Sequence, residues 1–458
     1  MTNQELIQKM YAAIHNAVAP SAPGNKAAPA SIFTMMPQGS TIIPEDYDPE
    51  DSAANRNRLA NTIPYVQKDY VSSGKVSDVY KQILTSQFPP DQEPTDEELK
   101  RLSDAEKYLE DSDHVDAYIT GMVEFAKARD AYWSAANSGD PKAHLLKPEM
   151  DAAMLKWVSR GHKEKYESSL AVQHQFYQKS PSRLVEAASR VFEEAEDPLS
   201  GYEAVFLPKN WQDPKCALSW ADILINEGTK RIHIHKDIEK VADNFTTHFS
   251  TGFWSVSSNS KYKDTVERLN QQSTACTTTL RMKIARVQIY RDWLNTSLMS
   301  YKTSWIPGLS AGQISNGTLQ NTQGLSMPVL PTELVLAKDV EVYCNFSDEE
   351  RRFLQDSKDE TADLGVSFLW FRLGKEHSEY HDTVTDQEQT DYKCNAKISL
   401  GKQPMILGFI NSVLPYYAYK DGTGMQAAPP LPKAERAVSP SLFCRAEQPQ
   451  FFSLRAGE

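Results

Sequence analysis

The sequence has few cysteines, and they follow no metal-binding or disulfide pattern. Its 458 residues contain five, which are widely spaced and never occur as Cys-x-x-Cys. An odd number at such spacing argues against a disulfide framework and against a zinc site built from cysteines alone. A reducing compartment therefore fits this chain best.

Long apolar stretches are also missing. No run of about 18 apolar residues occurs, so we expect no transmembrane helix. Residues 1–18 lack the basic and apolar regions of a signal peptide. We therefore expect a cytoplasmic protein, and secretion by a non-classical route stays open as the alternative.

The chain is short of positive charge. Lysine and arginine number 49 against 61 aspartates and glutamates, which gives a net charge of -12 and a pI of about 5.4. Binding to phosphate backbones or to anionic lipid requires clustered basic side chains. The composition therefore argues against nucleic acid as a partner and against simple electrostatic docking on a membrane.

Most motifs of catalysis are absent as well. The sequence has no P-loop, no Gly-x-Gly-x-x-Gly and no His-Glu-x-x-His. Gly308-Leu-Ser310-Ala-Gly312 matches the Gly-x-Ser-x-Gly motif, whose serine must lie between a buried strand and a helix. Neither flank fits, so we predict a turn here, and we expect no enzymatic activity and no cofactor. A hydrolase or metalloenzyme remains an alternative.

What the sequence does contain is one long strand-like stretch, Ser273–Leu294. Period-two alternation separates a core face from a solvent face. The alternation changes phase midway, because the second of two apolar series begins directly after the first ends: Leu280, Met282 and Ile284, then Ala285, Val287 and Ile289. One extra residue in a ladder produces such a shift, so we predict a β-bulge near Ile284–Ala285.

The first 197 residues predict helices. We divide them into an amphipathic helix and extended arm at 1–60 and an α-helical domain at 61–197. Capping boxes at Thr2–Glu5 and Thr95–Glu98 begin two of these helices. A further helix is expected over 148–177, because its apolar residues recur at helical spacing.

The remaining sequence predicts a β-rich domain at 198–419 and a Pro-rich tail at 420–458. Strand-like alternation recurs at Glu333–Phe346. The spacing of Ile406, Phe409, Ile410 and Val413 instead predicts a closing helix that Pro415 terminates.

Apolar residues near both ends of the chain are candidates for partner binding. A helix on a loose arm can clasp a neighbour, and an aromatic pair near the end of the tail can anchor in a groove. Packing against the chain's own domain is the simpler alternative for the helix. The residues concerned are Leu6, Met10, Ile14, Phe451 and Phe452.

Two pairs of histidines are candidates for metal ligands. His233 and His235 are two residues apart, so both imidazoles would point to the same side of a strand. His377 and His381 are four apart, a spacing that suits one metal only on a helix. A site requires the two segments to meet in space, and the charged residues around both pairs indicate exposure instead.

Two Ser/Thr-rich segments, 250–261 and 274–282, are candidates for a membrane-inserting hairpin. A spanning strand needs about 9–11 alternating residues, and aromatic side chains favour the interface. An ordinary surface hairpin is the alternative, since Lys261 and Arg281 interrupt the pattern. The apolar residues of this predicted hairpin are Phe249, Phe253, Trp254 and Val256.

Runs of helices followed by runs of strands predict an α+β protein, with an N-terminal helical bundle followed by a mainly antiparallel β domain. We expect a non-enzymatic protein that acts through protein–protein contacts or by self-assembly into an oligomer. The first alternative is a pore-forming, toxin-like protein that contacts a membrane through its Ser/Thr-rich hairpin.

Overall fold

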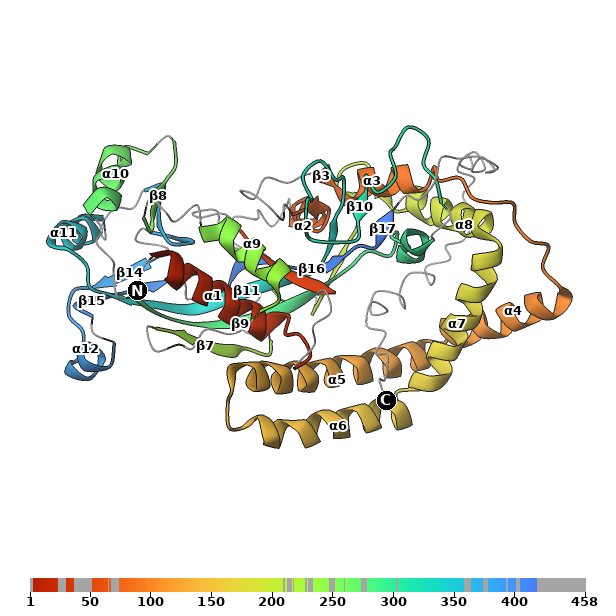
Figure 1. The fold of residues 1–458 in the computed structure, drawn as a ribbon, viewed down its shortest axis with the longest axis horizontal. Helices are drawn as coiled ribbons and strands as arrows, with labels where there is room; N and C mark the ends of the chain where they lie inside the picture. The colour runs from red at the N-terminus through yellow and green to blue at the C-terminus, as the bar shows by residue number, and fades with distance from the viewer. Residues whose placement is uncertain are drawn as a thin grey trace.

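The fold is mixed α+β, with antiparallel sheets, as the sequence predicts (Figure 1). The computed structural model describes residues 3–23, 30–36, 52–64, 66, 74–208, 211, 216, 218–226, 229, 234–246, 252–258, 260–272, 278–301, 304–357, 364–373, 378–392, 394–400 and 404–417.

The centre of the main sheet is the long strand β11 (Val329–Cys344). Along one edge it pairs with β9 (Thr278–Tyr290). Along its other edge it pairs first with β16 (Met405–Val413) and then with β15 (Ala396–Leu400). All these pairs are antiparallel, so the sequence identifies the two longest strands of the sheet.

Four shorter strands complete this eight-stranded sheet. β1 (Ser31–Met35) pairs with β16, and β14 (Ser378–His381) pairs with β15. β6 (Val205–Leu207) and β7 (Ala221–Ile225) pair with the far edge of β9. Part of the predicted N-terminal arm is therefore a strand of the sheet.

The predicted closing helix is wrong, because its residues form strand β16. This strand is buried on both faces from Met405 to Asn411 and pairs with neighbours on both edges. A strand that is buried on both faces has apolar residues at nearly every position. Such a run also satisfies helical spacing, which makes the pattern ambiguous.

The predicted β-bulge near Ile284–Ala285 is also wrong. The pairing of β9 with β11 is unbroken from Gln288 to Lys283, and the irregularity lies on β11, between Lys338 and Glu341. The phase change arises because β9 buries a different face in each half. Its first half faces the body cluster, and its second half faces the outer cluster on the other side of the sheet.

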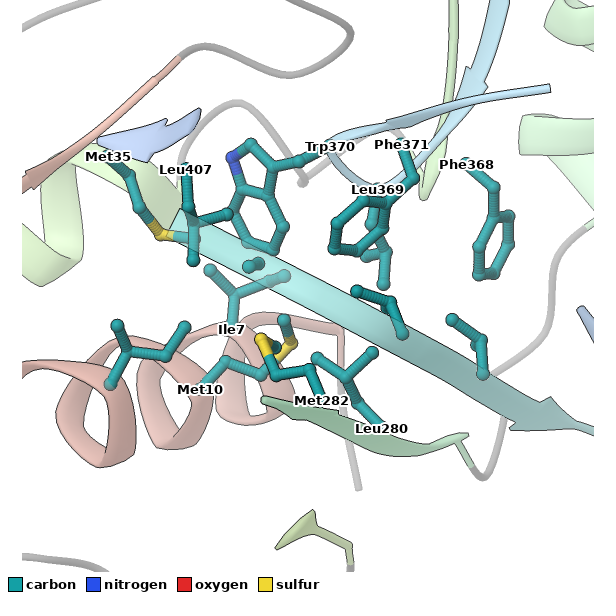
Figure 2. Close-up of a cluster of buried hydrophobic side chains, with 14 of the residues drawn as sticks. Ile7, Met10, Met35, Leu280, Met282, Phe368, Leu369, Trp370, Phe371 and Leu407 are labelled. Carbon is teal, nitrogen blue, oxygen red and sulfur yellow. The ribbon is translucent and has the colours of Figure 1, made fainter. Parts of the chain in front are cut away.

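The body cluster is the apolar core in which α1 (Asn3–Val18) and α9 (Lys236–Thr246) cover one face of the sheet. Figure 2 shows Met10 of α1 close to Met282 of β9. The outer cluster on the opposite face is smaller and consists of Met36, Leu59, Ala60, Phe206, Trp211, Val287, Ile289, Leu334, Leu336, Ile406 and Phe409.

A second, three-stranded sheet packs against the body cluster. It consists of β8 (Trp254–Val256), β12 (Val366–Phe368) and β13 (Phe371–Arg372). Leu369 and Trp370 form the tight turn between β12 and β13, and both are buried. Figure 2 shows these two side chains within the cluster, so the turn of this hairpin is part of the core.

Four long helices form a helical lobe beside the sheet (Figure 1). They have their own apolar core, the lobe cluster, which consists of Leu109, Val115, Tyr118, Phe125, Trp157, Tyr166 and Leu170. The lobe helices are α4 (Asp96–Glu110), α5 (Ser112–Ser138), α6 (Ala143–Arg160) and α7 (Lys163–Lys179).

Local signals set the ends of several lobe helices. Thr95 and Glu98 form the predicted capping box, in which each backbone N–H donates to the other side chain, at 2.9 and 3.2 Å. The single helix predicted over 148–177 is wrong, because the chain breaks at Gly161 and His162. His162 has a left-handed backbone, and a Cβ on Gly161 would lie 2.6 Å from Trp157 Cδ1.

The helices that flank the lobe in sequence belong to the sheet's side of the molecule. α3 (Val76–Ile83) and α8 (Pro181–Glu194) share an end cluster with Trp293 and Tyr417. The domain boundaries predicted at residues 61 and 197 are not tested by this packing. The apolar clusters themselves separate only α4–α7 from the rest.

The other described elements are short. They are α2 (Ser52–Ala60), β2 (Thr62–Ile63), β3 (Gly74–Lys75), β4 (Glu196–Asp197), β5 (Gly201–Tyr202), α10 (Lys263–Gln272), the 3-10 helix η3 (Thr296–Ser300), β10 (Ser315–Asn316), α11 (Asp348–Ser357), α12 (Asp386–Tyr392) and β17 (Tyr416–Tyr417).

Candidate partner-binding surface

Two of the four histidines predicted as metal ligands lie in the described residues, and they belong to different parts of the fold. His235 lies just before α9, with Nδ1 3.5 Å from Asp237 Oδ2, and His381 lies on the edge strand β14. His233 and His377 lie outside the described residues. Among the residues with described positions, no group of three or more His, Cys, Asp or Glu side chains could hold a metal ion.

The two segments of the predicted membrane hairpin do not pair with each other in the described residues, and the hairpin itself stays a prediction. Trp254 and Val256 lie in β8, which pairs with β12, whereas β9 pairs with β6, β7 and β11. Helix α10 lies between β8 and β9 in sequence. Phe253 and Trp254 are buried, and the indole Nε1 of Trp254 donates to Glu350 Oε1 at 2.9 Å. Phe249 lies outside the described residues.

Two further observations concern membranes and hydrolysis. None of the helices in the described ranges combines the length and the hydropathy that crossing a bilayer requires. Ser310 lies in an exposed turn, where its backbone N–H donates to Gln313 Oε1 at 2.9 Å. The strand and helix that a nucleophilic serine of this motif needs do not flank it.

The predicted partner-binding residues of the N-terminal helix lie in the core of their own chain. Leu6, Met10 and Ile14 are buried in the body cluster. This packing accounts for their amphipathic spacing without a partner. Phe451 and Phe452 lie outside the described residues, so their predicted role stays a prediction.

The cysteines bear on the expected compartment. Cys344 is disulfide-bonded, whereas Cys394 is a free thiol. Disulfides are rare in a reducing cytosol. The cytoplasmic location therefore stays a prediction, and the Cys344 disulfide is an observation against it.

The best candidate for a contact surface lies on α6, which the sequence did not single out. Of this fully described helix only Trp157 is buried. Its inner side packs on α5 through partly buried residues such as Met150 and Met154. In Figure 1, α6 lies on the side of α5 that is away from the sheet. The opposite side of α6 therefore faces outward.

An apolar row runs along this outward side. Leu145 is 59% exposed and Leu155 is 69% exposed, and the exposed residues Pro148 and Ala152 lie between them. Their spacings of three, four and three residues place all four on one stripe of the helix. Isolated exposed leucines are ordinary, but aligned ones form a patch that association would cover. We call this row the outward face of α6.

Charged residues border the outward face of α6. Lys156 Nζ lies 2.5 Å from Glu124 Oε2 of α5, which ties the two helices together beside the row. Glu149 and Asp151 are exposed near its middle. An apolar seam bordered by both signs of charge is the arrangement by which helices recognise other helices.

Electrostatics distinguish the opposite side of the lobe, where α5 meets the sheet. Arg286 of β9 lies 2.8 Å from Asp130 of α5 and 3.5 Å from Glu333 of β11. Burial tends to lower the pKa of Arg286, but these two carboxylates raise it overall, so the guanidinium stays charged. Burial also raises the pKa of Glu333. The lobe thus has an apolar outer side and a charged inner contact.

Sequence reasoning missed the outward face of α6 for a physical reason. A helix with apolar residues on two sides shows no clean amphipathic pattern. The single helix predicted over 148–177 begins after Leu145 and therefore omits the first residue of the row. The four-residue row itself was the available signal.

Comparison with known proteins assigns no function. No protein-family model matches this chain, and neither a curated protein nor a solved structure matches it.

Proposed function

We propose that this protein is non-enzymatic and acts through protein–protein contacts, assembling with further copies of itself through the outward face of α6. One observation carries the proposal, the exposed row at Leu145, Pro148, Ala152 and Leu155. A pair of such seams buries apolar side chains that otherwise face water, and this burial favours association.

The helix that bears the row supports this proposal. α6 contributes little to the lobe's own core, since only Trp157 is buried. Its outward leucines therefore do not stabilise the fold. Leucines at such positions are replaceable without unfolding the chain, which makes the contact testable.

The test is the molar mass in solution of the wild type and of the variant Leu145→Asp with Leu155→Asp, measured by light scattering over a range of concentrations. We expect the wild type to form oligomers at micromolar concentration. The dissociation constant of the variant should be about 30-fold higher or more, so it should assemble only at correspondingly higher concentrations. Two lost apolar contacts of this kind cost about 2 kcal/mol or more of association free energy.

Leu199→Asp is the matched control. Leu199 is 94% exposed and lies in the turn between β4 and β5, far from α6 in sequence. It should leave the mass unchanged. A wild type that stays monomeric at every concentration would contradict self-assembly, as would an oligomer that the double variant leaves intact.

Two other functions were open from the sequence, membrane insertion and hydrolytic or metal-dependent catalysis. No observation within the described part of the chain favours either of them.

A further inference from the structure

In the described part of the chain, the helical lobe contacts the rest of the molecule at two places, and the contact at its tip is polar. The tip is the end where α5 turns into α6, and it lies against the end of α1 (Figure 1). Asn16 of α1 donates to the backbone carbonyl of Ser134 at 3.0 Å. Asn137 donates to Asn16 Oδ1 at 3.0 Å and to the carbonyl of Ser21 at 3.1 Å.

Ionic contacts accompany these hydrogen bonds. Arg286 of β9 lies 2.8 Å from Asp130 Oδ2 and donates to the carbonyl of Val18 at 2.9 Å. Arg129 binds the other oxygen of Asp130 at 2.7 Å, and Glu333 lies 3.5 Å from Arg286. Two guanidiniums and two carboxylates thus join the lobe to the sheet. We call this set of polar contacts the latch.

None of the apolar clusters that the described residues form reinforces the latch. In the described residues, α5 and α6 contribute no side chain to the body, outer or end clusters. Apart from Ala135, their buried apolar residues belong to the lobe cluster, which α4 and α7 complete. Opening the latch therefore exposes groups that water solvates well, and little apolar surface.

The second place of contact has the form of a hinge. The chain enters the lobe between α3 and α4 and leaves it between α7 and α8, and these two connections lie side by side. Gln92 N–H donates to the carbonyl of Lys179 at 2.8 Å, and Ser182 N–H donates to Asp91 Oδ1 at 3.2 Å. Lys179 also pairs with Glu98 at 2.5 Å. Two adjacent single connections permit rotation about one point.

We infer that the helical lobe is a lever that turns about this hinge as a unit and is held against the sheet by the latch. The lobe keeps its fold when it opens, because the lobe cluster lies wholly within α4–α7. The sheet keeps its fold as well, because its clusters contain nothing from α5 or α6 in the described part of the chain. This inference does not depend on the proposed self-assembly.

The experiment measures the distance between the lobe tip and the sheet. Spin labels are attached through p-acetylphenylalanine at positions 142 and 222, so the native thiols stay unlabelled. Lys142 is exposed at the tip, and Asp222 is exposed on β7. Pulsed electron paramagnetic resonance on the full chain should give one short distance in the wild type. The variant Asp130→Asn should add a second, longer population.

Two further variants make the result specific. Glu124→Gln breaks an ion pair inside the lobe and should keep the single short distance. The double variant Asn16→Cys with Ser134→Cys places two thiols across the latch, where Asn16 Nδ2 lies 3.3 Å from Ser134 Oγ, so that oxidation can join them. In the Asp130→Asn background, oxidation of this double variant should abolish the long distance, and reduction should restore it.

Three results would overturn the inference. The first is a single short distance in Asp130→Asn. The second is a long population that persists after oxidation of the double variant Asn16→Cys with Ser134→Cys in the Asp130→Asn background. The third is a loss of helical circular dichroism in Asp130→Asn, because the lever requires the lobe to stay folded when the latch opens.

Discussion

The sheet side of the molecule and the helical lobe bury their side chains very differently. The body cluster draws on two sheets and four helices, α1, α9, α10 and α11, and most of its aromatic and aliphatic members are fully inaccessible. The lobe cluster has seven members, and α6 contributes only Trp157. The sheet side therefore buries much apolar surface, whereas the lobe is a thin layer of helices that buries little.

This difference indicates how the two regions divide their roles. Dense, mutually dependent packing resists change, because the loss of one side chain leaves a cavity that neighbours cannot fill. A two-layer helical lobe depends on a few contacts and leaves surface free for other molecules. The proposed contact surface and the proposed latch both belong to the lobe.

The largest expected effect is on the sheet side, at the tip of the β12–β13 hairpin. Trp370→Ala should lower the free energy of unfolding by about 3–5 kcal/mol, because it leaves a cavity the size of an indole within the body cluster. Urea denaturation followed by circular dichroism measures the loss. Leu199→Ala, at an exposed turn, should change stability by less than about 0.5 kcal/mol. A loss below about 1 kcal/mol in Trp370→Ala would contradict this role of the hairpin.

The next effect depends on pH and concerns α1, which covers the sheet. His15 is buried, and burial lowers its pKa from 6.5 to about 4. As the pH falls below 6.5 the unfolded state binds the proton first, so stability is full above that pH and declines toward pH 4. The loss should reach about 3 kcal/mol at pH 4.

Urea denaturation at several pH values between about 7 and 4 measures this decline. The variant His15→Gln removes the titrating group, so its stability should depend less steeply on pH over the same interval. An unchanged pH dependence in this variant would show that other groups cause the decline.

The smallest expected effect is on the stability of the helical lobe, at the contact between α5 and α6. Gly121→Ala would place a Cβ 2.4 Å from Trp157 Cδ1, where α5 and α6 pack most closely. Alanine gains about 1 kcal/mol of helix propensity over glycine, but overpacking costs about 1–3 kcal/mol. We expect net destabilisation that hydrogen exchange detects in α5 and α6 and not in β9.

Asp116→Ala is the matched control for helix propensity, because Asp116 is an exposed position on the same helix. It should leave exchange in α6 unchanged or slow it. If Gly121→Ala instead stabilised the lobe, its two long helices would not be closely packed at this point. If β9 also exchanged faster, the lobe and the sheet would unfold together.

Local sequence signals predicted local features well. The capping box at Thr95 is present, with both of its reciprocal hydrogen bonds. Alternation predicted β9 and β11. Each of these features is set by residues within about one turn or a few positions of one another, so the sequence expresses them directly.

Features that depend on distant neighbours were predicted poorly. The spacing in β16 predicts a helix because burial on both faces removes the alternation that marks a strand. The phase change in β9 led to the prediction of a bulge. The sequence shows which side chains are apolar, but it does not show that the two halves of the strand pack against clusters on opposite faces of the sheet. The outward face of α6 was missed because exposure is not a property of sequence.

The sequence by itself determined that this is an α+β protein with antiparallel strands, capped helices and an excess of acidic residues. Only the tertiary structure decided that α1 covers the sheet of its own chain, that β9 changes its buried face, and that Arg286 meets Asp130. The physical reason is how far apart in the sequence the interacting residues lie. Caps and alternation follow from bonding between near neighbours, whereas burial and ion pairing depend on which distant segments the packing of the core brings together.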